Sequence, residues 1–167
     1  PPSVTAVIVC RNGARWLPQV LDALASLPHL PQAVVAVDVS STDETREILA
    51  RYLHPASIRT APPGTGFGAA VRVALDGAAP TEWVWLLHDA SAPGPDALAH
   101  LLDQVTQSED IGIAGPKLRE WPSLKRLLEV GVTISGTGAR ETGLERGEPD
   151  QGQHDRPRDV LAVSTAG

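Results

Sequence analysis

WVWLLHDASAP, residues 83–93, is the stretch of this sequence that decides the fold. It begins as an apolar run, which is typical of a strand covered on both faces in a parallel sheet. The run ends at His88 and Asp89, so the strand delivers a carboxylate to its carboxyl end, the edge where open α/β sheets bind ligands. An acidic turn at that edge favours a divalent cation that shields a phosphorylated ligand from the carboxylate. Ala90 follows, however, where a second acid is expected.

Apolar runs alternate with helix-like periodicity along the rest of the chain. Strands are predicted at 4–9, 33–38, 57–60, 83–87 and 111–114, with weaker candidates at 130–135 and 160–163. Helices are predicted at 17–24, from a capping box of Ser41 and Glu44 to Tyr52, from the loop 64–68 to Leu75, and from Pro95 to Val105. This order predicts an α/β fold with a doubly wound, mostly parallel sheet and helices on both faces. Residues 1–167 are expected to form a single domain, with a flexible loop at 136–159.

Composition excludes several classes of protein. The 14 basic and 20 acidic side chains give a net charge of −6, and no basic cluster follows a predicted helix, so nucleic acid is not an expected partner. The single cysteine excludes an internal disulfide framework and suits a reducing compartment, for which the cytoplasm is the natural choice. No apolar run approaches the roughly 20 residues that span a bilayer.

Polar residues follow three of the predicted strands: Cys10-Arg11-Asn12, Asp38-Val39-Ser40-Ser41 and His88-Asp89. Carboxyl ends of parallel strands share one edge, so these residues are expected to line one crevice. Asp38 can accept a hydrogen bond from a base or ribose, or it can merely start a turn, and we favour ligand contact. Ser40 and Ser41 can donate to a ligand, but for Ser41 a helix cap is favoured. The pair His88-Asp89 is read as functional, with a polar strand end as the alternative.

The loop 64–68 (GTGFG) opens a predicted helix, so its backbone N–H groups are candidates for phosphate binding. A glycine-rich turn chosen for close packing is the alternative. A dinucleotide fingerprint would follow the first strand, and no P-loop motif is present, which disfavours a nicotinamide-binding domain. Cys10 is interpreted as a small apolar group rather than a nucleophile.

The ordered set of motifs resembles family 2 glycosyltransferases. It consists of VIVCRN (7–12), VDVSSTD (37–43), GFGAA (66–70) and LLHDASAP (86–93). The HDA turn, GPKL (115–118) and DQGQHD (150–155) resemble large actinobacterial, membrane-associated members. The resemblance implies a GT-A fold, a UDP, GDP or TDP sugar donor, and Mg or Mn. It also implies an inverting transfer that builds a cell-envelope glycan or glycolipid.

Carried over by motif, Cys10, Arg11, Asn12 and Asp38 would surround the nucleoside, and Gly66 and Gly68 would pack beneath the diphosphate. The nucleotide-binding set also includes Ser40, His88 and, through a phosphate, Arg72. Asp89 would belong to the metal-binding acidic motif.

The chain departs from the family's pattern at three positions. Val39 stands where members often carry Asp or Asn, Val71 precedes Arg72, and Ala90 replaces the acid that ligates the metal, which would weaken Mg or Mn binding. The resemblance places the catalytic base beyond Gly167. The chain is therefore expected to be the donor-binding part of a longer enzyme, inactive alone, that works at the inner face of the plasma membrane through other segments. A catalytically silent nucleotide-sugar-binding or scaffold domain is the alternative.

Overall fold

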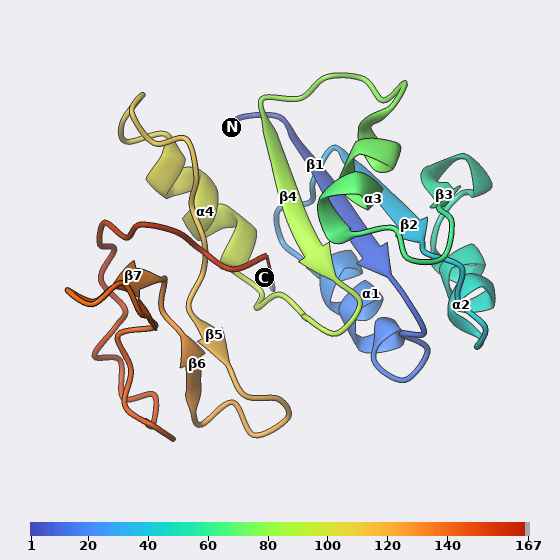
Figure 1. The fold of residues 1–167 in the computed structure, drawn as a ribbon. Coiled ribbons are helices and arrows are strands. Elements are labelled where there is room, and N and C mark those ends of the chain that lie inside the picture. Colours follow the sequence, from blue (N-terminus) through green and yellow to red (C-terminus); the bar gives the residue numbers. More distant parts are fainter. Residues whose placement is uncertain (166–167) are drawn as a thin grey trace. The chain divides into compact units, whose positions relative to one another are not determined.

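The computed structural model describes residues 1–165, and the chain divides into two compact units, Pro1–Leu98 and Ala99–Gly167. Figure 1 shows the strands and helices of the described residues. That residues 1–167 form one domain stays a prediction. No helix in the described part of the chain is both long enough and apolar enough to cross a membrane.

A four-stranded parallel sheet forms the centre of the first unit. Its strands are β1 (Val4–Cys10), β2 (Ala33–Asp38), β3 (Ile58–Thr60) and β4 (Trp83–His88), in the order β3-β2-β1-β4. All seven residues of β1 are buried, because this central strand has a neighbour on each side and helices above and below. The predicted strands at 4–9, 33–38, 57–60 and 83–87 are confirmed to within one residue at each end.

Helices cover both faces of this sheet, as predicted. They are α1 (Leu17–Ala25), α2 (Thr45–Tyr52) and α3 (Phe67–Leu75), with a short 3-10 turn η1 (Pro55–Ser57) before β3. In Figure 1, α3 lies in front of the sheet and α1 behind it. Ala70 and Ala74 of α3 pack on Val7, Val9 and Val37 of the strands, which gives the front face its apolar core. This arrangement confirms the doubly wound α/β class.

Two details of the first unit differ from the prediction. β4 is an edge strand of the sheet, so Val84 is 38% exposed and the strand is covered less completely than its apolar sequence indicates. The capping box is wrong, because α2 begins at Thr45 and its N-cap residue Glu44 makes no side-chain cap. Instead, Asp43 Oδ1 accepts the hydrogen bond of the Thr45 N–H at 3.1 Å. Ser41 has another partner, described below.

The last predicted helix, α4 (Ala97–Val105), begins two residues after Pro95 because Pro95 and Asp96 form a turn. The predicted strand at 111–114 is wrong, since these residues pair with no strand and Ile113 is 75% exposed. The second unit instead contains two short antiparallel pairs, β5 (Leu118–Arg119) with β6 (Leu127–Glu129) and β7 (Thr133–Ile134) with β8 (Arg140–Glu141). Of the strand predicted at 130–135, only β7 is present. The strand predicted at 160–163 is reduced to a single bridge between Ala162 and Val132.

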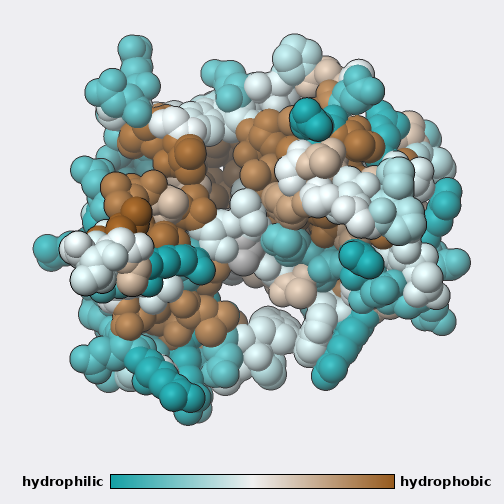
Figure 2. Space-filling model, viewed as in Figure 1, coloured by the Kyte–Doolittle hydropathy of each residue, from teal (hydrophilic) through white to brown (hydrophobic). Residues whose placement is uncertain are grey.

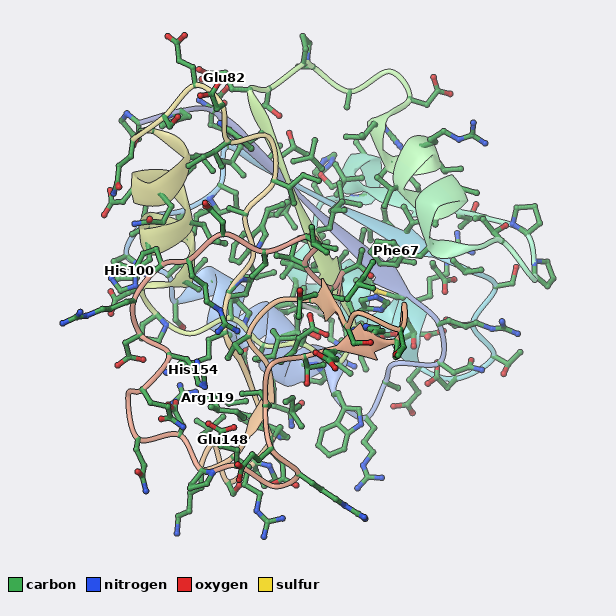
Figure 3. The ribbon with its side chains drawn as sticks, turned by 60° about the vertical axis from the view of Figure 1, so that its left-hand side comes forward. Phe67, Glu82, His100, Arg119, Glu148 and His154 are labelled. Atoms are coloured by element: carbon green, nitrogen blue, oxygen red, sulfur yellow. The ribbon has the colours of Figure 1, made fainter. Side chains whose placement is uncertain are left out.

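Ionic contacts hold parts of the segment 136–159 against the rest of the second unit. The Lys117 ammonium donates to Asp150 at 2.9 Å and to Asp155 at 2.5 Å, and Arg140 donates to Glu129 at 2.7 Å. Figure 3 shows Glu148 and His154 close to one another, with 3.2 Å between Oε1 and Nε2. The mobility of 136–159 stays a prediction.

Several large apolar side chains of the second unit are exposed, among them Leu128, Ile134 and Leu161. Figure 2 shows brown, apolar patches on this part of the surface. Isolated apolar groups are common on protein surfaces and carry no functional argument by themselves.

The contrast along β4 gives a test of the fold. Leu87 is 1% exposed, so Leu87→Ala leaves a cavity beside β1 and is expected to lower the free energy of unfolding by about 2–5 kcal/mol. Val84→Ala on the same strand removes a partly exposed side chain and is expected to cost about 1 kcal/mol or less. Urea unfolding of both variants measures the difference, and equal losses would contradict the placement of β4.

Candidate functional site

The carboxyl ends of the four strands meet at one edge of the first unit. Cys10 lies opposite Asp38 in the β1–β2 pair, Val9 lies opposite His88 in the β1–β4 pair, and Asp38 lies opposite Thr60 in the β2–β3 pair. The predicted convergence of the three polar strand ends is therefore present in the structure. The loop that follows β1 lies in the middle, between the ends of β2 and β4.

This central loop is held through its backbone. Each N–H group from residue 11 to residue 14 donates a hydrogen bond to a side chain from another loop. The acceptors, in order, are Asp89 Oδ2 at 2.7 Å, Ser41 Oγ at 2.9 Å, Thr45 Oγ1 at 2.9 Å and Asp43 Oδ2 at 3.0 Å. Backbone N–H groups near a buried strand end need partners, and here side chains supply all four. The loop is consequently fixed to both β4 and the β2–α2 loop.

Asn12 is the turning point of this loop. Its backbone is left-handed, with φ of 52°, a conformation that asparagine tolerates better than most residues. Its side-chain Oδ1 accepts the N–H of Thr42 at 2.8 Å. The amide oxygen is thus engaged within the protein, and the amide nitrogen is the part of this exposed residue that can serve a ligand. Arg11 beside it is exposed as well.

Asp38 is 3% exposed, and its Oδ1 accepts the N–H of Ser41 at 3.1 Å. No hydrogen bond within residues 1–165 reaches its other carboxylate oxygen. Both interpretations of Asp38 therefore have support: it starts the turn after β2, and it keeps one acceptor free at the strand end.

The two serines after β2 make hydrogen bonds to other loops and cap no helix. Ser40 has a left-handed backbone, with φ of 50°, and its hydroxyl donates to the carbonyl oxygen of Ala61 at 2.9 Å. Its hydroxyl proton is therefore not available to a ligand, contrary to the expectation. Ser41 accepts from Asn12, so the cap that was favoured for Ser41 is wrong. The physical reason is that the backbone N–H of Asn12, in the β1–α1 loop, occupies the hydroxyl oxygen of Ser41.

Cys10 is fully buried. Burial raises the pKa of its thiol, and the negative charges of Asp89 and Asp38 raise it further. The thiol therefore stays protonated at neutral pH and is no nucleophile, in agreement with its interpretation as a small apolar group. Its carbonyl oxygen accepts the N–H of Val39 at 2.9 Å. Nothing in this placement supports a nucleotide contact by the Cys10 side chain.

His88 stacks on Phe67 from the start of α3, with ring centroids 4.4 Å apart and 21° between the planes. Figure 3 shows Phe67 projecting from the amino end of that helix. Burial lowers the pKa of His88 below its ordinary value, although the neighbouring Asp89 opposes this shift. His88 is therefore neutral at pH 7, and its ring links the end of β4 to α3.

The loop before α3 is open rather than tightly packed. Gly66 is the N-cap residue of α3, and a Cβ on Gly66 or Gly68 would meet no other atom of the described chain within 4 Å. The close-packing alternative is therefore wrong for these glycines. Ala70 is the first residue whose N–H bonds within the helix, to Gly66 O at 2.9 Å, so the N–H groups of residues 67–69 carry no intrahelical bond. Their partial positive charge suits an anion.

Arg72 lies one turn further along α3. It stands in the last turn of the helix, is exposed, and lines a shallow hollow with Thr65, Ala69 and Asp76. Thr65 belongs to the loop before α3 and Ala69 to the helix start, so Arg72 shares this hollow with the segment whose N–H groups suit an anion. Its contact with a phosphate stays a prediction.

Asp89 is the only predicted metal ligand. Burial raises the pKa of its carboxyl, partly offset by the N–H of Arg11 and by His88. In residues 1–165, no three His, Cys, Asp or Glu side chains come together as a metal site would require. One Asp89 oxygen is engaged by the loop, and Ala90 offers no ligand. The side chains at this edge therefore do not by themselves fit a divalent cation.

Four residues of this edge were missed by sequence reasoning: Gly13, Asp43, Thr45 and Phe67. No role is predicted for Gly13 from the sequence, and the run 41–45 is predicted only as a helix start. The density of short hydroxyl and carboxylate side chains in that run was the available signal, because such side chains bond to nearby backbone groups in loops as well as at caps. Phe67 carried no distinct signal.

Solved structures with the same fold were found at low sequence identity. A mannosyltransferase from Pyrobaculum calidifontis, in complex with GDP-Man and Mn²⁺, is 24% identical, with a TM-score of 0.55 over 71% of this chain and 36% of that one. TarS 1–349 from S. aureus, in complex with UDP-GlcNAc, is 19% identical, with a TM-score of 0.51 over 71% and 38%. Glucosyl-3-phosphoglycerate synthase from Mycobacterium tuberculosis, in complex with UDP, is 18% identical, with a TM-score of 0.50 over 66% and 42%.

These likenesses, together with the parallel sheet, define a GT-A-like α/β domain with its loops at the carboxyl edge of the strands. The sequence matches the family described as "Glycosyltransferase like family 2" over residues 1–167. The chain belongs to this family. It spans less than half the length of each of the three solved structures. No curated protein matches the sequence.

The hydrogen bond from Gly13 to Thr45 gives a test of the site's construction. Thr45 is fully buried, so Thr45→Val keeps the shape but leaves the buried Gly13 N–H without an acceptor, at an expected cost of about 1–3 kcal/mol in unfolding free energy. Thr45→Ser retains the hydroxyl and is the matched control, expected to cost less. Chemical denaturation measures both, and a Val variant as stable as the Ser variant would contradict the described role.

Proposed function

We propose that this chain binds the nucleotide diphosphate sugar donor of a glycosyl transfer, at the edge formed by the ends of β1, β2 and β4. Membership of glycosyltransferase family 2 supports the class of reaction. The observation that carries the proposal is the meeting of Asn12, Asp38 and the open glycine loop at one sheet edge, within one compact unit. Ligands of open α/β sheets bind at this edge.

The nucleoside is assigned to the side of the site formed by β1 and β2. Asp38 offers a second carboxylate oxygen with no hydrogen-bond partner in the described chain, which suits the hydroxyl or N–H donors of a ribose or base. Asn12 offers amide N–H donors from a loop that its own oxygen helps to fix. Arg11 adds an exposed positive charge beside them. UDP, GDP and TDP are all compatible with these groups.

The diphosphate is assigned to the start of α3. The N–H groups of residues 67–69 have no intrahelical acceptor, and each such contact with an anion is worth about 0.3–1 kcal/mol. The space where Gly66 and Gly68 would carry a Cβ is open, so a phosphate can approach the backbone closely. The His88 ring, stacked on Phe67, lies beside this helix start.

The proposed reaction is a direct displacement. An acceptor hydroxyl attacks the anomeric carbon, the bond from this carbon to the diphosphate oxygen breaks, and the configuration inverts while a base takes the hydroxyl proton. The proposed acceptor is a cell-envelope glycan or glycolipid, and the proposed setting is the cytoplasmic face of an actinobacterial membrane. No residue of the described chain is assigned as the base.

The Pyrobaculum mannosyltransferase complex contains Mn²⁺ together with GDP-Man. Because the side chains of residues 1–165 do not form a cation site by themselves, no step of the proposed reaction depends on a metal here. A catalytically silent sugar-nucleotide-binding domain is the second candidate, and Ala90 in the acidic turn favours it. Donor binding that is strengthened by Mn²⁺ would favour the enzyme over the silent domain.

Substitution of Asp38 tests the proposed donor site. Asp38→Asn keeps an oxygen for the Ser41 N–H but removes the carboxylate charge, so the affinity for the best-bound of UDP, GDP and TDP is expected to fall by about tenfold or more. Glu82→Gln lies at the opposite edge of the sheet, where Glu82 bonds to Ser3, and is expected to leave the affinity unchanged. Calorimetric titration measures both. Equal affinities in the two variants would remove Asp38 from the site.

Restoring an acid in the turn after β4 tests the consequence of Ala90. Ala90 is exposed, so Ala90→Asp is expected to fold normally and to increase the gain in nucleotide affinity that Mn²⁺ gives over EDTA, by about tenfold. Ala92→Asp adds the same charge at an exposed position two residues further on and serves as the control. If the ratio of the nucleotide affinity in Mn²⁺ to that in EDTA is the same in Ala90→Asp as in the wild type, the metal-ligand assignment of this turn is wrong.

A further inference from the structure

The turn after β4 and the loop after β1 are joined at one point. Asp89 Oδ2 accepts the backbone N–H of Arg11 at 2.7 Å, across 78 positions of sequence. This is the only one of the four anchors of residues 11–14 that comes from the turn after β4. The other three come from the run 41–45, on the opposite side of the loop.

Gly13 shows how closely the loop approaches this carboxylate. A Cβ built on Gly13 would lie 2.7 Å from both Cβ and Cγ of Asp89, and closer still to Oδ2. Real Cβ atoms do not come this near to other atoms, so any side chain at position 13 would require Asp89 or the loop to move. Gly13 is buried, which leaves the loop little room to do so.

The surroundings of Asp89 suit a hydrogen bond to backbone better than the binding of a cation. The carboxylate is half-buried, one of its oxygens faces the loop, and no group of three potential ligand side chains occurs within residues 1–165. A hydrogen bond to an ionised carboxylate is among the stronger ones in proteins. Its partner here is the residue next to Asn12, whose amide is assigned to the nucleoside.

We infer that Asp89 is a positioning residue for donor binding: its carboxylate, received in the space left by Gly13, holds the β1–α1 loop so that Asn12 faces the nucleotide. The effect on the donor rests on the proposed function, whereas the anchoring of the loop does not. On this account, the acidic residue of the HDA turn acts through the backbone of the neighbouring loop. Gly13 is needed at its position because the carboxylate fills the place of a side chain.

Two variants at position 89 separate anchoring from charge. Asp89→Asn keeps an oxygen acceptor for the Arg11 N–H, whereas Asp89→Ala keeps none. Amide hydrogen exchange of the full chain is expected to show the N–H of Arg11 protected in the wild type and in the Asn variant, and at least about tenfold faster in the Ala variant. The N–H of Val39, which bonds to Cys10 O, is the internal control and is expected to exchange equally in all three.

Donor affinity is measured on the same proteins in EDTA, with the nucleotide that the wild type binds best. The Asn variant is expected to bind within about threefold of the wild type, and the Ala variant about tenfold or more weakly. Equal and large losses in both variants would overturn the proposal, because they would show that the charge and not the anchor matters.

A double-mutant cycle tests the contact between Gly13 and Asp89 directly. Gly13→Ala is expected to destabilise the wild type markedly but to be tolerated in an Asp89→Gly background, where the space is vacant. The same loss in both backgrounds would overturn the proposal. The exchange measurement and the cycle need no donor, so a failure of the proposed function appears separately, as a wild type that binds none of UDP, GDP and TDP.

Discussion

The four backbone N–H groups after β1 are the constraint on which this site depends. They lie directly beyond a fully buried strand, and the bond of the Gly13 N–H is itself buried, so leaving this group unpaired would be costly. Side chains from two other strand ends satisfy all four. The same bonds that stabilise the loop therefore fix the relative positions of the ends of β1, β2 and β4.

This solution determines which groups remain for a ligand. Ser40 and Ser41, which look like ligand donors or caps in the sequence, are used to hold loops together. Asn12 and Asp38 each use one oxygen internally and keep a polar group for a ligand, and the start of α3 keeps its N–H groups and the open space beside Gly66. The groups available to a ligand at this edge of the sheet are thus the polar groups that make no hydrogen bond within the protein.

The strands and helices of the first unit were predictable because continuous apolar runs mark buried strands such as β1, and apolar residues recur at helical spacing in helices such as α1. The convergence of Asn12, Asp38 and Asp89 followed from the parallel topology. The roles of Ser41, Thr45 and Gly13 did not follow, because their hydrogen-bond partners lie 29 or 32 positions away in sequence. In the second unit, the two-residue strands β5 and β7 are too short to show a period, and the apolar run at 111–114 has no strand to pair with.

The central claim, that three loops form one sugar-nucleotide site, is tested most directly by a ¹H–¹⁵N NMR titration of the chain with UDP, GDP and TDP sugars. The account predicts that the amide shifts that change with the bound donor cluster at residues 11–14, 38–42, 66–70 and 88–89. Residues 76–82, at the other end of the sheet, should not respond. Changes confined to residues 76–82 or to the second unit, or no change with any of the three donors, would contradict it.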